Sequence, residues 1–383
     1  MKYIVILGDG MADEPLTELG GKTPLEYART PHMDSIAREG MMGMIRTIPE
    51  GYEAGSDIAN LGILGYDPRS CYTGRGPLEA ASMGIDLAPH DFAYRCNLVT
   101  IRDNVMADFS AGHISSGEGK ALFTTLAEHI PSVPLYPGVS YRNLLVVQGG
   151  EGAKTWPPHD IVGKNVDPYL PAGSDARVLL KCMEKSRKVF SDHPVNLARI
   201  SRDQPPATQI WPWSGGQRPT LTPFRSLFGK DGGVISAVDL LQGIARLAGM
   251  EVIQVPGATG YLDTDYQAKA VYALDAVNHL DFVYIHIEAP DEAGHLGSAP
   301  EKVRAIERVD ELVGTVIKEF SGIIAVLPDH PTPVKIKTHT GDPVPFAIWG
   351  KGSDSTRAFS EKEGSRGGYG TIDAPSFLPL LFS

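Results

Sequence analysis

The chain contains 383 residues, 42% of them hydrophobic, and carries a formal net charge of -11. This length predicts more than one compact domain, and the acidic balance argues against nucleic acid or an acidic membrane surface as the main partner. The three cysteines show neither a disulfide framework nor a metal-binding spacing, and no apolar run reaches the ~20 residues of a membrane helix. We therefore expect a cytoplasmic protein with free thiols, and the sequence leaves its oligomeric state open.

The first element is a β-branched run over residues 3–7, which predicts a buried parallel strand and is too short for a signal peptide. Asp9 follows this strand at its carboxyl end, where open α/β sheets bind ligands. A helix is then predicted to open at Pro31 and to end at Gly40, and a second is predicted over residues 56–64.

The middle of the chain has a different pattern. Proline and glycine clusters interrupt residues 94–210, which contain short predicted strands such as 143–147 and one strong helix over 176–190. We interpret residues 94–210 as an inserted, smaller α/β domain, so that residues 1–93 and 211–383 form one discontinuous domain.

The C-terminal part alternates between helical and strand patterns. In chain order these are helix 234–248, strand 251–255, helix 267–277, strand 282–287, helix 301–320, strand 322–327 and strand 344–349. Such alternation predicts an α/β fold with a mostly parallel sheet flanked by helices.

Acidic and histidine side chains follow two of these strands. Asp291 and His295 are four residues apart, a spacing that places both on one face of a helical turn. Asp329 and His330 are adjacent within a proline-bounded turn, and His339 follows closely. Carboxylate oxygens combined with imidazole nitrogens suit Mn²⁺ or Zn²⁺, and the number of ligands is enough for more than one ion. The ordinary alternatives to metal binding are that Asp291 and His295 form an exposed helix-capping pair and that Asp329 and His330 form a polar turn.

Ser56 is predicted to start a helix, directly after Gly55. A serine there can be a simple N-cap, but it also meets the positive end of the helix dipole and free backbone N–H groups, which can hold a phosphate. A serine hydroxyl becomes a good nucleophile only when a base or a metal activates it. Asp9, Ser56 and the Asp/His motifs together predict a two-metal phosphoryl-transfer site.

These residues lie in segments that resemble the cofactor-independent (2,3-bisphosphoglycerate-independent) phosphoglycerate mutases of the archaeal type, in the alkaline phosphatase superfamily. The most specific strings are APDEAGH at 289–295 and PGATG at 256–260. The other matching segments are residues 7–13, 30–34, 55–60, 72–80 and 328–330.

The resemblance implies an alkaline-phosphatase-like fold and an isomerase of glycolysis and gluconeogenesis, which interconverts 3-phosphoglycerate and 2-phosphoglycerate through a phosphoserine on Ser56. It implies two divalent ions, usually Mn²⁺ with Zn²⁺, Co²⁺ or Mg²⁺ as substitutes, and no 2,3-bisphosphoglycerate. One ion is expected to be held by Asp291, His295 and His339. The other is expected to be held by Asp9, Ser56, Asp329 and His330.

The resemblance also implies that the insert is a substrate-binding lid, which excludes water from the phosphoserine. The candidates for contacts to an anionic substrate are Arg75, Arg142, Arg199, Arg202 and Lys230. Each of them could instead be an ordinary solvated cation on the surface.

Three further functions remain open from the sequence. Residues 79–86 are similar to a bacterial branch proposed as homoserine kinases, and the metal and serine residues suit that reaction equally well. A metallophosphatase and a metal-stabilised binding module are the other two.

Overall fold

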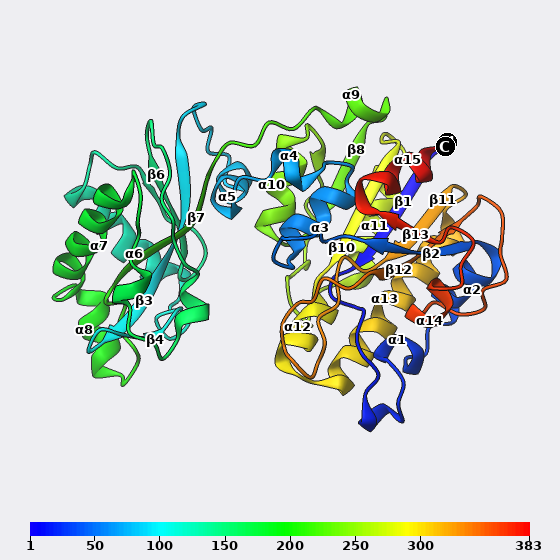
Figure 1. The fold of residues 1–383 in the computed structure, drawn as a ribbon, viewed down its shortest axis with the longest axis horizontal. Helices are drawn as coiled ribbons and strands as arrows, with labels where there is room; N and C mark the ends of the chain where they lie inside the picture. Colours follow the sequence, from blue (N-terminus) through cyan, green and yellow to red (C-terminus); the bar gives the residue numbers. More distant parts are fainter. The chain divides into compact units, whose positions relative to one another are not determined.

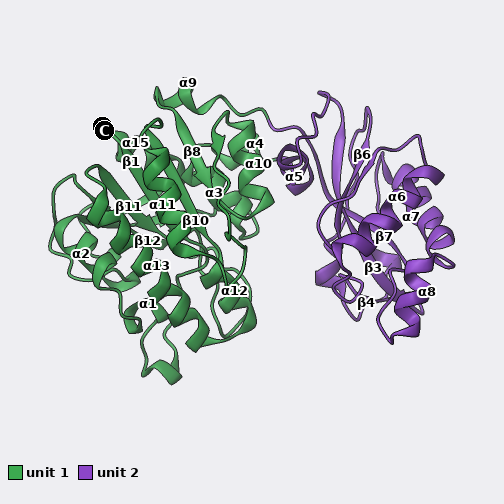
Figure 2. Cartoon of the chain, turned by 180° about the vertical axis from the view of Figure 1, so that it is seen from behind, with its two compact units in different colours: residues 1–72, 220–383 green, residues 73–219 purple.

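The computed structural model describes residues 1–383 and divides them into two compact units (Figure 2). Unit 1 consists of Met1–Tyr72 and Thr220–Ser383, and unit 2 consists of Thr73–Pro219. Unit 2 begins earlier and ends later than the expected insert of 94–210. The reason is that α5 (Arg75–Ser82) and the last residues of β7 (Gln209–Gln217) pack in unit 2 rather than in unit 1. No helix has the length and apolarity that crossing a bilayer requires.

Unit 1 is built on an eight-stranded sheet with the order β13-β2-β12-β11-β1-β10-β8-β9 (Figure 1). Its strands are β1 (Tyr3–Gly8), β2 (Met41–Arg46), β8 (Gly232–Ile235), β9 (Glu251–Val252), β10 (Phe282–Ile287), β11 (Ile323–Leu327), β12 (Val344–Trp349) and β13 (Thr371–Asp373). All neighbouring pairs are parallel except those of β12, which runs antiparallel to β11 and β2. The predicted α/β fold with a mostly parallel sheet is confirmed.

Helices cover both faces of this sheet. On one face, alternate strand residues such as Ile4, Ile6 and Val326 pack against α2, α11 and α13. On the other face, the hydroxyl of Tyr284 donates to the amide oxygen of Asn60 in α3. The helices of unit 1 are α1 (Pro24–Tyr27), α2 (Pro31–Glu39), α3 (Ser56–Ile63), α4 (Pro68–Cys71), α9 (Phe224–Phe228), α10 (Asp239–Leu247), α11 (Tyr266–Ala276), α12 (Ala289–Leu296), α13 (Ala299–Glu319), α14 (Glu361–Gly364) and α15 (Phe377–Phe382).

Two local predictions for unit 1 were wrong. The helix predicted over 234–248 is divided, because Val234 and Ile235 pair with β10 as the end of β8, and α10 begins only at Asp239. Ser56 is not the N-cap of α3 but its first residue, and its hydroxyl lies beside Asp9 and His330. Gly55 occupies the N-cap position instead.

Unit 2 contains an antiparallel sheet with the order β4-β3-β6-β5, to which β7 adds by pairing with β3. Its other strands are β3 (Phe92–Arg102), β4 (Val105–Asp108), β5 (Leu135–Tyr136) and β6 (Arg142–Val147). Its helices are α5, α6 (Ser116–His129), α7 (Ala176–Phe190) and α8 (Pro194–Ser201). Residues of α6 and α7 bury a separate apolar core against β3 and β7.

A buried ion pair connects the segment after β1 to the segment after β11. Lys302 Nζ lies 2.7 Å from Asp13 Oδ2, and neither side chain is exposed. The same ammonium donates to the carbonyl oxygens of Ala12 and Thr332, and Asp13 also accepts a hydrogen bond from the backbone of Val334. The ion pair thus fixes two chain segments that leave adjacent strands at the same sheet edge.

The Lys302→Met variant should be strongly destabilised, because it leaves the carboxylate of Asp13 buried without its partner. Loss of one member of a buried pair typically costs about 3–5 kcal/mol. The matched control is Arg308→Met on the same helix, whose pair with Glu311 is exposed and should contribute less than about 1 kcal/mol. Urea denaturation of both variants measures the difference, and equal losses would show that the buried pair has no special role.

Candidate metal centre

The candidate site lies at the carboxyl ends of three adjacent parallel strands, β11, β1 and β10. Asp9 directly follows β1, α12 with Asp291 follows β10, and Asp329 and His330 follow β11. Parallel strands end at the same edge, so residues about 300 positions apart in the sequence meet there, as the open α/β architecture predicts.

The first group consists of Asp291, His295 and His339. Residues 291 and 295 lie one turn apart on α12, with His295 Nε2 3.2 Å from Asp291 Oδ2. His339 Nε2 lies 3.5 Å from Asp291 Oδ1 and 3.0 Å from His295 Nε2. Ligands of one tetrahedral ion with bonds near 2.1 Å are about 3.4 Å apart, so these distances suit a shared cation.

The outer hydrogen bonds of the two histidines fix their tautomers. His295 Nδ1 lies 3.0 Å from the carbonyl oxygen of Lys337, and His339 Nδ1 lies 3.2 Å from that of Ala54. A carbonyl oxygen only accepts, so each Nδ1 carries the proton and each neutral ring presents a lone pair on Nε2. Two such nitrogens 3.0 Å apart need a positive charge between them, which a proton on His295 supplies without metal and a metal ion supplies in its place. This arrangement fits a metal ion.

The second group consists of Asp9, Ser56, Asp329 and His330. The Ser56 hydroxyl lies 3.3 Å from Asp9 Oδ2 and 3.1 Å from His330 Nε2. His330 Nε2 is also 3.5 Å from Asp9 Oδ1 and 3.6 Å from Asp329 Oδ2. Burial lowers the pKa of His330, which favours the neutral ring that a metal requires.

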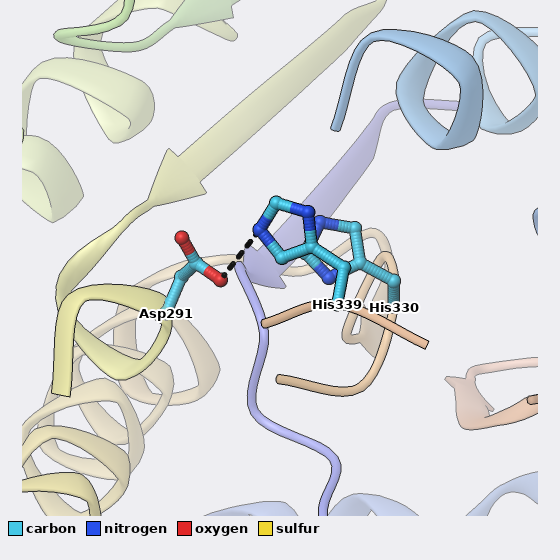
Figure 3. A group of neighbouring side chains, drawn as sticks. All are labelled: Asp291, His330 and His339. Atoms are coloured by element: carbon cyan, nitrogen blue, oxygen red, sulfur yellow. Dashed lines mark ion pairs between the residues drawn. The ribbon is translucent and has the colours of Figure 1, made fainter. Parts of the chain in front are cut away.

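His330 is close to both groups. Its ligand atom lies within 4.8 Å of those of Asp9 and Asp329, and a second set with the same spacing consists of Asp291, His330 and His339. Figure 3 shows the rings of His330 and His339 side by side, with the carboxylate of Asp291 directed towards His339. The expected assignment had placed His295, rather than His330, with Asp291 and His339; His295 remains within reach of both but is more exposed.

The centre is strongly negative. Burial raises the pKa of Asp9, and the charges of Asp329 and Asp291 raise it further. Burial also opposes ionisation of Asp291, but hydrogen bonds from His295 and His339 hold its pKa well below the usual range. The hydrogen bond to Asp291 in turn raises the pKa of His295 to about 9. Three converging carboxylates beside imidazole nitrogens suit divalent cations.

Two polar side chains that the sequence gave no role support the carboxylates. The amide of Asn60, one turn after Ser56 on α3, donates to Asp329 Oδ2 at 2.9 Å and to the carbonyl of Ser56. The Thr332 hydroxyl donates to Asp291 Oδ1. Asn60 lies within the segment 55–60, which carried the resemblance, but only the folded chain reveals its partner.

Arg75 and Arg142 lie near a third arginine in unit 2 that the sequence did not single out. Arg95 forms a 2.9 Å ion pair with Glu79 and stacks over the ring of Trp213. Burial lowers the pKa of Arg95, Glu79 opposes this, and the charges of Arg75 and Arg142 add to the lowering. Arg75 and Arg142 thus place positive charge close to Arg95.

The remaining predicted substrate contacts have structural partners. Arg199 is buried, pairs with Glu118 and donates to backbone carbonyls, including that of Ala111. Arg202 pairs with the same Glu118, so both arginines connect α8 to α6.

The expected anion contact at Lys230 is at the wrong end of the sheet. Its ammonium lies over the rings of Tyr3 and Phe382, beside the start of β1, whereas the carboxylates follow the ends of the strands. Lys230 precedes β8, which runs parallel to β10, so chain direction alone places it at the edge opposite the candidate site.

Comparisons with known proteins show the family to which the chain belongs. The sequence model of the 2,3-bisphosphoglycerate-independent phosphoglycerate mutase family matches residues 37–196. Proteins of that name from Methanothrix thermoacetophila and Methanosarcina barkeri are 52% and 50% identical to this chain; both alignments cover 100% of it, and 100% and 99% of the relatives.

Among solved structures, a protein from Pyrococcus horikoshii has a TM-score of 0.86 and 32% identity, covering 99% of this chain and 96% of that one. The cofactor-independent phosphoglycerate mutase of Thermoplasma acidophilum has a TM-score of 0.67 and 28% identity, covering 100% and 99%. The chain therefore belongs to the family of 2,3-bisphosphoglycerate-independent phosphoglycerate mutases and is an enzyme of that class.

Proposed function

We propose that the enzyme interconverts 3-phosphoglycerate and 2-phosphoglycerate in glycolysis and gluconeogenesis, through a phosphoserine on Ser56, with two divalent ions and without 2,3-bisphosphoglycerate. The observation that carries this proposal is the position of the Ser56 hydroxyl between Asp9 and His330. A serine that only capped α3 would direct its oxygen at the backbone of the helix, and this one does not.

Ser56 also has the surroundings of a phosphoryl acceptor. As the first residue of α3 it lies at the positive end of the helix, where backbone N–H groups without helical partners favour an anion. Asn60 holds both the carbonyl of Ser56 and the carboxylate of Asp329, so the nucleophile and one proposed ligand are fixed by the same amide.

The proposed transfer is balanced in two halves. Ser56 Oγ forms a bond to phosphorus as the bond between phosphorus and the 3-oxygen of the substrate breaks. The proton lost by the Ser56 hydroxyl is matched by the one gained on that leaving oxygen. In the second half, the 2-hydroxyl of glycerate takes the phosphoryl group and gives up its proton, and Ser56 regains one.

We assign Asp291, His295 and His339 to one ion and Asp9, Ser56, Asp329 and His330 to the other, with His330 close enough to contribute to either. Mn²⁺ is the proposed metal, and we propose that Zn²⁺, Co²⁺ or Mg²⁺ can substitute for it. When bound, the ions supply positive charge that lowers the pKa of the Ser56 hydroxyl and neutralises the phosphoryl oxygens. The protein residues orient the nucleophile and hold the carboxylates apart.

The arginine cluster of unit 2 supports a small anionic substrate. Arg75, Arg95 and Arg142 gather positive charge in a protein whose net charge is -11, and Arg95 pairs with Glu79. We propose that this cluster binds the substrate carboxylate and that unit 2 acts as the lid. Exclusion of water is essential, because hydrolysis of the phosphoserine would turn a mutase into a phosphatase.

The Ser56→Ala variant should lose at least about 10³-fold in mutase activity, because the transfer has no acceptor without the hydroxyl. The matched control is Ser70→Ala, an exposed serine that bonds only to a local carbonyl and should leave activity unchanged. A coupled assay with 3-phosphoglycerate measures both, without added 2,3-bisphosphoglycerate. Activity that survives in Ser56→Ala would exclude a phosphoserine at this residue.

The same assay discriminates other acceptors of the phosphoryl group. Phosphorylation of homoserine without mutase turnover would indicate a kinase, and faster release of inorganic phosphate than of 2-phosphoglycerate would indicate a phosphatase. Either outcome would contradict the mutase proposal while retaining the same nucleophile.

Metal affinity should increase with pH up to about 9. His295 holds a proton below this value because Asp291 raises its pKa, and an ion that takes Nε2 must displace that proton. Release of this proton makes the affinity of the ion that His295 binds rise about tenfold per pH unit in this range. Isothermal titration calorimetry in buffers of different ionisation enthalpy measures the proton release. An affinity that does not change between pH 6 and pH 9 would contradict ligation by His295.

The Arg142→Ala variant should raise the KM for 3-phosphoglycerate about tenfold with a smaller change in kcat, because a charge-assisted contact to the substrate is lost. Arg177→Ala is the control, since that exposed arginine lies on α7, away from the cluster. Steady-state kinetics of both variants would refute the binding role if their KM values were equal.

A further inference from the structure

A buried histidine of β10, which none of the sequence motifs singled out, contacts the candidate metal centre. The His286 side chain is fully buried, and its Nε2 atom lies 3.1 Å from Asp9 Oδ2. The contact follows from the sheet register, because His286 pairs with Leu7 of β1, two residues before Asp9, and side chains two residues apart share a face.

The surroundings of His286 favour a proton on Nε2. The other nitrogen, Nδ1, lies 3.4 Å from the hydroxyl oxygen of Ser236. That oxygen already accepts a hydrogen bond from the backbone of Val238, so its own hydrogen is free to be donated to Nδ1. A proton on Nε2 follows from its neighbour, since a bare nitrogen lone pair 3.1 Å from a carboxylate oxygen would be repelled. The contact falls short of hydrogen-bond geometry, and this buried nitrogen has no other hydrogen-bond partner.

The backbone of His286 is held as firmly as its ring. Lys269, itself fully buried in α11, donates from Nζ to the carbonyl oxygen of His286 at 2.9 Å. Hydrogen bonds therefore restrain this histidine from two sides, through Ser236 and through Lys269, in addition to the strand pairing of β10.

His286 does not have the position of a metal ligand. The two groups whose ligand atoms all lie within 4.8 Å of one another consist of other residues, and His286 belongs to neither. It contacts the carboxylate of Asp9, whereas Ser56 and His330 also approach that carboxylate, at 3.3 and 3.5 Å.

We propose that His286 is a positioning residue, whose buried Nε2–H, without another partner, attracts the carboxylate of Asp9 and holds it in the orientation facing Ser56 and His330. The proposal rests on the proposed function in one respect, namely that Asp9 binds an ion. A neutral donor suits this task, since it stabilises an ionised carboxylate among Asp329 and Asp291 without placing a competing positive charge beside the metal. Such supporting hydrogen bonds commonly change metal affinity 10–100-fold.

The test compares His286→Leu, which removes the donor, with His286→Gln, whose amide keeps an N–H group at similar reach. Apo-protein is titrated with Mn²⁺, and free ion is counted by electron paramagnetic resonance. We expect His286→Leu to weaken the binding of one of the two Mn²⁺ ions about 10–100-fold and to change the binding of the other little. His286→Gln should recover most of this loss. Ser236→Ala removes the hydroxyl beside His286 Nδ1 and so no longer favours a proton on Nε2. It should weaken the binding of the same ion by a smaller factor.

His279→Leu is the control, because this exposed histidine pairs with Glu251 away from the centre and should leave both affinities unchanged. Unaltered affinities in His286→Leu would overturn the proposal. A loss equally large in His286→Gln would also overturn it, by showing that the site needs only the shape of the ring. Should His286→Leu fail to fold, the glutamine and Ser236→Ala variants still decide the question.

The binding experiment separates this inference from the proposed function, because it needs no substrate. Absence of any Mn²⁺ binding by the unaltered protein would overturn both. Normal binding by the unaltered protein and by His286→Leu alike would overturn only the role of His286. In the loaded enzyme, a positioning role further predicts that His286→Leu lowers kcat with little change in the KM for 3-phosphoglycerate.

Discussion

The candidate site depends on the parallel alignment of β11, β1 and β10. Because the three strands run in the same direction side by side, their ends deliver Asp329, Asp9 and Asp291 to one edge of the sheet. Each carboxylate alone would occupy an ordinary turn. Only their convergence creates a negative charge density that the neighbouring imidazoles do not neutralise, and the buried pair of Lys302 and Asp13 keeps two of the three segments in place.

The sequence was most informative where a motif and its chemistry lie close together. The spacing of Asp291 and His295 is local, so their shared helix face could be predicted before the structure was known. Asn60 and His286 could not be assigned in this way, because their partners lie 269 residues away for Asn60 and across the β1–β10 pairing for His286. No local pattern encodes such contacts.

The errors have equally physical causes. A positive charge near the end of the insert made Lys230 a candidate, but charge does not reveal at which end of a strand a residue lies. The C-terminal end of unit 2 lies later than predicted because it includes the whole of β7, which contains Pro212 and two glycines, residues that are unusual in a strand. Within the sheet β7 pairs only with β3, and an edge strand tolerates a proline.

The insertion of unit 2 between Tyr72 and Thr220 has a consequence for synthesis on the ribosome. β1 leaves the ribosome first, yet both of its neighbours, β10 and β11, belong to the last part of the chain. Unit 2 is contiguous and emerges complete before them, and domains generally fold as units in the order of their synthesis. β1, the central apolar strand of the larger unit, therefore stays unpaired until more than two hundred later residues have been synthesised. During this interval the nascent chain depends most on protection from aggregation.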